Sequence, residues 1–135
     1  MALARITLSG LDELTAAFVT AGSQAPAVIE QALREEADEA FRLSQEVVPV
    51  EFGVLRSSGT VKSGRTGSQI WAQISYGGSG ADYAIYVHEI PPSRAKHAPP
   101  TRWKYLEYPV KEYSKGMEGR LRVRMLDIIV RRFAI

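Results

Sequence analysis

The chain of 135 residues contains no cysteine and only two histidines. Without cysteine it has no disulfide, no thiolate nucleophile and no cysteine-ligated zinc site. The spacing of His88 and His97 does not make a helical metal-binding pair. No apolar run approaches the roughly 18 residues that indicate a membrane-spanning helix. We therefore expect a soluble protein with no membrane contact, no bound metal and no cofactor.

Motifs of catalysis are scarce as well. The glycine-rich stretch 77–80 lacks the following Lys-Ser/Thr pair of a phosphate-binding loop and is typical of a hinge between elements. The serines Ser57, Ser58 and Ser63 do not stand in a nucleophile elbow, the strand-turn-helix setting that activates a serine. We predict no catalytic residue and expect that the chain is not an enzyme.

Basic residues are rare in the first part of the chain. Residues 1–54 carry 3 basic and 9 acidic residues, a net charge of −6, whereas residues 55–135 carry 14 basic and 6 acidic residues, a net charge of +8. Such asymmetry indicates a nucleic-acid-binding face on the basic half, or a surface that pairs with the opposite half of a neighbouring copy. Solvated helix faces that merely differ in sign are the third explanation.

Hydrophobic periodicity predicts the helices. A short helix is expected over residues 11–19 and a long one over about 26–48, which Pro49 ends. A last helix is expected from Pro109 to about Arg132, although the alternation of arginine with apolar residues over 120–125 also fits a strand. Four acidic residues of the long helix are expected mostly on its solvated face, as an acidic surface and not a catalytic cluster: Glu35, Glu36, Asp38 and Glu39.

Between the helices the pattern changes to the period of strands. Residues 58–63 and 69–76 flank a glycine-containing loop at 64–67 and predict an antiparallel hairpin. Trp71 falls on the polar face of the second strand, either as a partly covered aromatic or as an anchor for another subunit. Residues 83–89 fit a strand or one to two helical turns.

These elements predict a single α+β domain over residues 1–135. In it, a long N-terminal helix and a C-terminal helix pack on a small antiparallel β-sheet. Residues 91–102 form a proline-rich basic loop, in which no regular element is expected. We expect this loop to be exposed.

Three short runs carry a resemblance to a known family. Residues 48–58 (VPVEFGVLRSS) resemble the Pro-Val-x-x-Gly-x-Leu-Arg-x-Ser segment of the small head-to-tail connector proteins of long-tailed bacteriophages, also called neck, tail-completion or minor capsid proteins. Residues 83–89 (YAIYVHE) resemble that family's Tyr-Ala-x-Tyr-Val-(His)-Glu segment, and residues 103–110 (WKYLEYPV) resemble its Lys-Phe-Leu-Glu-x-Pro entry into the last helix. The runs stand in the family's order. Phe52 departs from the pattern, because a small polar residue is common there.

The resemblance implies a non-enzymatic structural protein of the virion neck, assembled in the host cytoplasm. Its copies would form a hexameric or dodecameric ring at the head–tail junction and join the capsid connector to the tail. Expected partners are further copies of the chain and neighbouring connector or stopper, tail-terminator or tail-tube proteins. The loop over residues 91–102 would dock on a neighbouring ring. Nonspecific contact with DNA in the channel is expected from Arg65 or this loop.

A closed ring requires that one patch on each copy meets a different patch on the next. We expect acidic residues of the long helix to approach basic residues of the second half in the adjacent copy. We also expect Arg56 to pair with a carboxylate such as Glu89. The candidate interface residues are Glu35, Glu36, Asp38, Glu39, Arg56, Trp71, Arg94, Lys96, Arg102, Arg120 and Arg124.

A small basic DNA-binding protein is the alternative function. Arginines of the C-terminal half, among them Arg120, Arg122 and Arg124, would neutralise phosphates. Tyr105 and the tyrosines that follow it, Tyr108 and Tyr113, would stack on bases. No helix-turn-helix, zinc-finger or single-strand-binding motif accompanies them.

Overall fold

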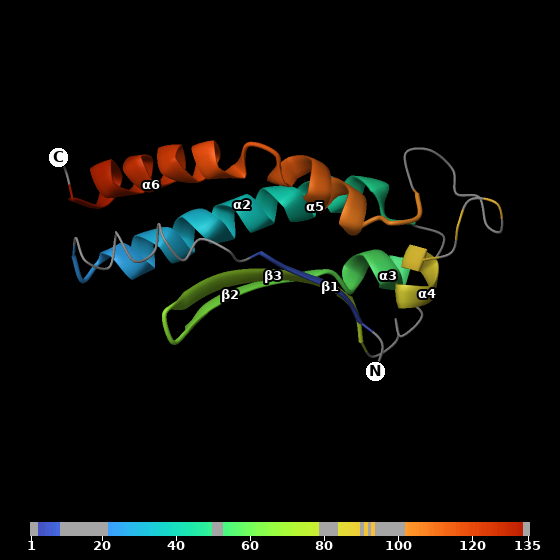
Figure 1. Cartoon of the computed structure of the whole chain (residues 1–135). Helices are drawn as coiled ribbons and strands as arrows, with labels where there is room; N and C mark the ends of the chain where they lie inside the picture. Colours follow the sequence, from blue (N-terminus) through green and yellow to red (C-terminus); the bar gives the residue numbers. More distant parts are fainter. Residues whose placement is uncertain are drawn as a thin grey trace.

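A computed structural model of the chain describes residues 3–8, 22–49, 53–78, 84–89, 91, 93 and 102–133. In these ranges an antiparallel sheet lies beneath a layer of helices (Figure 1). The sheet has the strand order β1-β3-β2, with β1 at Leu3–Leu8, β2 at Thr60–Thr66 and β3 at Gln69–Gly77. The helices are α2 (Ala25–Val47), α3 (Gly53–Ser57), α4 (Ala84–Glu89), α5 (Glu107–Ser114) and α6 (Met117–Phe133).

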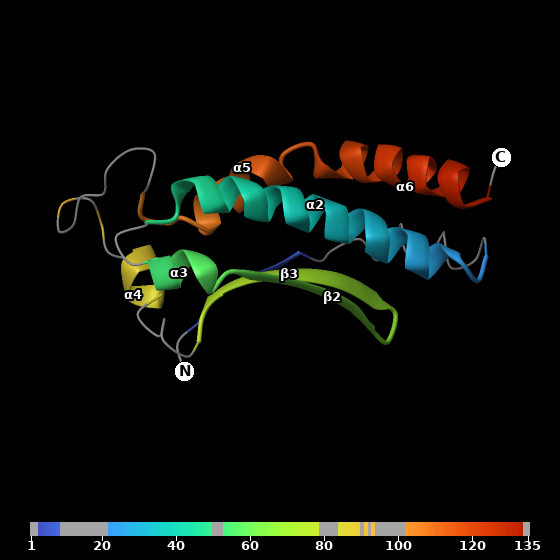
Figure 2. The same ribbon diagram turned by 180° about the vertical axis from the view of Figure 1, so that it is seen from behind.

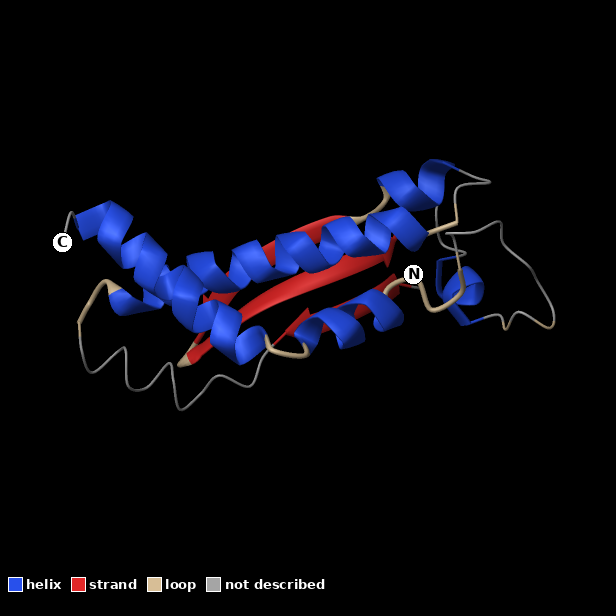
Figure 3. Cartoon of the chain, turned by 90° about the horizontal axis from the view of Figure 1, so that it is seen from above, coloured by secondary structure: helices blue, strands red, loops and turns tan. Residues whose placement is uncertain are grey.

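The α+β class is confirmed, with the long N-terminal helix and the C-terminal helix on one side of the antiparallel sheet. Helix α2 packs on β2 and β3 with one side and on α5 and α6 with the other. Seen from above, α2 and α5 run over the sheet and α6 crosses over α2 (Figure 3). The expected helix over residues 11–19 lies outside the described residues, as does most of the expected loop over 91–102.

Helix α2 forms the centre of the fold because its buried residues recur at helical spacing. Val28, Ile29, Ala32, Leu33 and Ala37 are all at most 1% exposed. Small alanines at these positions let the helix approach the sheet closely. At 1.5 Å per residue the 23-residue helix is about 35 Å long, and it extends along the whole sheet in Figure 2.

The hairpin is present, but its turn lies later than the sequence predicted. Strand β2 continues through Arg65 and Thr66, which pair with Ile70 and Gln69 of β3. The chain reverses at Gly67, whose φ of 62° lies in the left-handed region that favours glycine. The side chain of Arg65 forms an ion pair of 3.0 Å with Glu30, which connects this end of β2 to α2.

Two elements were not predicted. Strand β1 pairs with β3 along its full length, including Ile6 opposite Ile74, and helix α3 follows α2 directly. The predicted last helix is divided into α5 and α6 by a turn at Gly116, whose φ is 77°. Residues 84–89 are helical, and so are residues 120–125, so the strand alternatives at both places are wrong.

A buried chain of hydrogen bonds connects α2, β3 and the segment before α5. Gln45 Nε2 donates to Tyr76 Oη (2.8 Å), and Ser44 Oγ donates to the Tyr105 carbonyl (2.8 Å). The Tyr76 hydroxyl must therefore donate to Ser44 Oγ, 2.9 Å away. Burial raises the pKa of Tyr76, which keeps this hydroxyl protonated.

Candidate functional site

Glu36 lies at the centre of a charged cluster that joins three helices. Its side chain is fully buried in α2 and accepts hydrogen bonds from Arg120 Nε (2.9 Å) and Arg124 Nε (2.6 Å) of α6. Tyr113 Oη of α5 donates a third bond of 2.9 Å. The guanidinium of Arg120 also stacks on the ring of Tyr113, 3.9 Å from its centroid. The carboxylate thus fixes α5 and α6 against α2.

This cluster corrects the prediction that Glu36 lies on a solvated face and contacts a neighbouring copy. Its 0% exposure leaves no surface for a second chain. Arg120 and Arg124, expected to meet acidic residues of another copy, instead bind acidic residues of their own chain, and Arg124 also reaches Glu35 at 3.2 Å. The spacing could have revealed this burial, because position 36 continues the buried series of Ile29, Leu33 and Ala40.

The two remaining acidic candidates of α2 do lie on its outer side. Asp38 pairs with Arg34 at 3.1 Å and Glu39 pairs with Arg42 at 2.7 Å, in ion pairs within the helix. Exposed pairs of this kind contribute at most about 1 kcal/mol. An interface role for these two residues stays a prediction.

Trp71 lies on the sheet face that is turned away from the helices. Its ring covers Gly64 of β2, where an added Cβ would lie 2.8 Å from Trp71 Cζ2. Its Nε1 donates to Thr66 Oγ1 at 3.1 Å. These contacts favour the partly covered aromatic over the subunit anchor, and the anchoring role stays a prediction.

Two of the three runs that resemble the connector family contact each other directly, and the first shares their apolar core. Lys104 N donates to the His88 carbonyl (2.8 Å), and Tyr105 Oη donates to the Ala84 carbonyl (2.7 Å). Leu55 of α3 lies in the same apolar core as Ala84 and Tyr105. Helices α3 and α4 lie toward the same end of the molecule in Figures 1 and 2. Runs far apart in the sequence therefore build one structural unit.

His88 connects two of these runs through its Nε2 and binds its neighbour Glu89 through its Nδ1. Its Nε2 accepts a hydrogen bond from Glu107 N (3.2 Å), so the ring proton lies on Nδ1, which donates to Glu89 Oε1 (2.9 Å). Glu89 also pairs with Lys104 at 2.6 Å. The expected pair of Arg56 with Glu89 is wrong, because Arg56 instead donates to Gln45 Oε1 at 3.3 Å.

The ion pair of Glu89 predicts a small loss of stability in acid. Lys104, and then His88, hold the pKa of Glu89 below its ordinary value. A carboxyl with a lowered pKa stabilises the fold at neutral pH, and this contribution is lost as the pH falls through the folded-state pKa. Because Glu89 is 52% exposed, we expect screening by solvent to limit the effect to less than about 1 kcal/mol. Between neutral and acidic pH, the thermal unfolding midpoint of Lys104→Met should fall less than that of the wild type.

The control for this measurement is Lys62→Met, which removes an exposed lysine from β2. Its unfolding midpoint should keep the wild-type dependence on pH. An unchanged acid sensitivity in Lys104→Met would contradict the assignment of the effect to Glu89.

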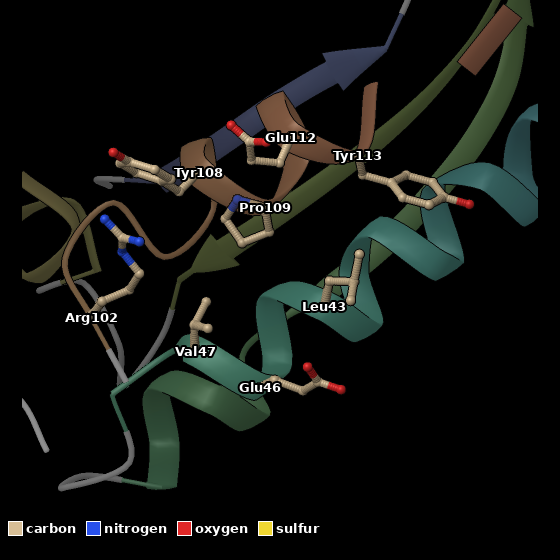
Figure 4. Close-up of a pocket in the computed structure, with 8 residues that line it drawn as sticks. All are labelled: Leu43, Glu46, Val47, Arg102, Tyr108, Pro109, Glu112 and Tyr113. Carbon is tan, nitrogen blue, oxygen red and sulfur yellow. The ribbon is translucent and has the colours of Figure 1, made fainter. Parts of the chain in front are cut away.

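A groove lies between the C-terminal half of α2 and helix α5 (Figure 4). Its volume is about 270 Å³. Leu43 and Val47 of α2 face Pro109 of α5 across the groove. Glu46 lies on its α2 side and Glu112 on its α5 side. The guanidinium of Arg102 lies 3.6 Å from the centroid of the Tyr108 ring at one end. The lining residues are Leu43, Glu46, Val47, Arg102, Tyr108, Pro109, Glu112 and Tyr113.

Helix α6 carries apolar residues on two opposite faces. Leu121, Met125 and Ile128 are buried against the rest of the fold. Val123, Leu126 and Val130 are 69%, 63% and 44% exposed. We name these three residues the α6 stripe. The expected helix over residues 109–132 carried no indication of this second apolar face.

The described residues contain no group of three or more His, Cys, Asp or Glu side chains that could hold a metal ion. In the same ranges no helix is long and apolar enough to cross a membrane. Of the basic interface candidates, Arg94 and Lys96 lie outside the described residues. Arg102 lies in the groove, where it also donates its backbone N–H to the Val47 carbonyl at 2.8 Å.

Comparisons of the chain with protein-family models, with curated proteins and with solved structures found no match.

Proposed function

We propose that this chain is a structural protein of a bacteriophage virion. Its copies assemble into a ring at the head–tail junction and join the capsid connector to the tail. The observation that carries the proposal is the direct contact between the second and third connector-like runs, which lie far apart in the sequence. The second and third runs contact each other through His88, Ala84 and Tyr105, and Leu55 of the first run lies in the same apolar core.

The α6 stripe supports an assembling protein independently of the resemblance. Single exposed apolar residues are ordinary on a protein surface, but contiguous apolar patches mark interaction sites. Val123, Leu126 and Val130 recur at spacings of three and four residues and so form one contiguous line along the helix. A partner that covers this line would remove it from water.

The alternative of DNA binding receives less support from the described residues. Arg120 and Arg124 are engaged with buried Glu36, and Arg122 pairs with Glu118 at 2.9 Å. Tyr105 is fully buried and cannot stack on a base. In a gel-shift titration we expect weak binding or none, whereas submicromolar affinity with a steep salt dependence would favour the alternative.

Two measurements test the proposed function. Native mass spectrometry and negative-stain electron microscopy of the purified chain should show a closed ring at high concentration. Mass spectrometry and immunogold labelling of purified virions should place the chain at the neck. A chain that stays monomeric at high concentration and is also missing from virions would overturn the proposal.

A further inference from the structure

We propose that the α6 stripe of one copy docks in the α2–α5 groove of a second copy. The inference rests on the proposed function, because it identifies the two surfaces that would join neighbours in the ring. The two surfaces differ, so the contact is heterologous. A heterologous contact repeats from copy to copy and closes into a ring when the rotation allows it.

The stripe lies on the side of α6 that faces away from the described part of the fold. At 100° per residue, Leu126 and Val130 lie roughly opposite Leu121 and Ile128 on the helix surface. Because the face with Leu121 and Ile128 is buried against the fold, the opposite face points away from it. Among the described residues nothing covers this face, which leaves it open to a second copy.

The groove offers a surface of matching chemistry on the same chain. Its two walls present the apolar side chains of Leu43, Val47 and Pro109 (Figure 4). Its two edges carry Glu46 and Glu112, whose side chains are 55% and 61% exposed. Glu46 pairs with Arg42 at 2.6 Å and Glu112 with Lys115 at 3.3 Å, in exposed ion pairs that are weak enough to exchange partners. After such an exchange, an apolar surface between two carboxylates suits an apolar helix flanked by cations.

Helix α6 is such a helix. Arg122 and Arg131 flank the stripe and are 67% and 59% exposed. Their present partners are Glu118 and Asp127 of the same helix, at 2.9 Å in both pairs. Exposed pairs of this kind are weak, so the arginines can exchange these partners at little cost. Charge complementarity thus favours a second copy as the occupant of the groove.

The two surfaces lie in different parts of the helical layer. Figure 1 shows the C-terminal part of α6 at one end of the molecule, while α5 and the end of α2 lie toward the other end. A copy bound through its stripe therefore keeps its own groove open for a third copy. This arrangement permits chain growth and ring closure instead of stopping at a dimer.

Leu126→Glu tests the stripe, because it introduces a carboxylate that would face Glu46 and Glu112. We expect the concentration at which half of the chain is assembled to rise at least about tenfold in sedimentation velocity experiments. Far-UV circular dichroism should remain that of the wild type, since Leu126 is 63% exposed. Val54→Glu is the matched control, because Val54 is an exposed apolar residue of α3 outside both surfaces, and it should assemble like the wild type.

The double variant Glu46→Lys with Glu112→Lys tests the groove from its own side. Its lysines would repel Arg122 and Arg131, so this variant should also need a higher concentration to assemble. Each of the two variants keeps one intact surface. Mixing Leu126→Glu with the double variant should therefore restore association, through the intact stripe of the double variant and the intact groove of Leu126→Glu.

The outcomes separate the inference from the proposed function. Rings that persist in Leu126→Glu or in the double variant would overturn the docking and leave the ring function standing. A wild type that stops at a dimer, or that stays monomeric, would also overturn the docking. In that case the presence of the chain in purified virions still decides the proposed function.

Discussion

Replacing Glu36 with glutamine should lower the free energy of unfolding by about 3 kcal/mol. The substitution keeps the size of the side chain but removes the charge that binds Arg120 and Arg124. These two guanidiniums would then lie beside each other and beside an amide, in a site whose acceptor is 0% exposed. The glutamine amide can also turn an N–H group toward the arginines, where an acceptor is needed. A buried donor without an acceptor lowers the free energy of unfolding.

Chemical denaturation followed by circular dichroism measures this loss, and the thermal midpoint should fall by about 10 °C. Glu39→Gln is the matched control on the same helix. It removes an exposed pair with Arg42, whose side chain is 56% exposed, and should change the free energy of unfolding by less than about 1 kcal/mol. Equal stabilities for Glu36→Gln and the wild type would show that the cluster contributes nothing net to the fold.

The sequence revealed the elements whose burial pattern is strong and local. The apolar positions of α2 and the alternation of Ile70, Ala72 and Ile74 in β3 predicted both elements and their inner faces. Strand β1 was missed because its existence depends on pairing with β3, more than 60 residues away. Helix α3 was missed because five residues are too few for a helical period to be visible.

From the charge asymmetry we expected acidic residues of the long helix to meet basic residues of a neighbouring copy. Pairing within the chain was not foreseen, because it depends on the packing of α6 over α2. The structure places Arg120 and Arg124 on Glu36 and Arg65 on Glu30 of the same chain. Similarly, the apolar residues of α6 were visible in the sequence, but their division between two faces depends on which face α2 covers.

The two faces of α6 predict opposite effects for two neighbouring substitutions. Leu121→Ala should lower the free energy of unfolding by about 3 kcal/mol, because Leu121 is fully buried and its truncation leaves a cavity. Val123→Ala should change it by less than about 0.5 kcal/mol, because Val123 is 69% exposed and a surface substitution usually has little effect. Urea denaturation of both variants measures the difference.

Self-association would complicate this comparison, since binding that favours the folded state raises the apparent stability. We therefore expect the clearest result when both substitutions are made in the Leu126→Glu background, in which each chain unfolds alone. In the otherwise wild-type chain, Val123→Ala should weaken assembly while the monomer keeps its stability. If Val123→Ala instead destabilises the monomer as much as Leu121→Ala does, Val123 is buried in solution and the α6 stripe is not free to bind a second copy.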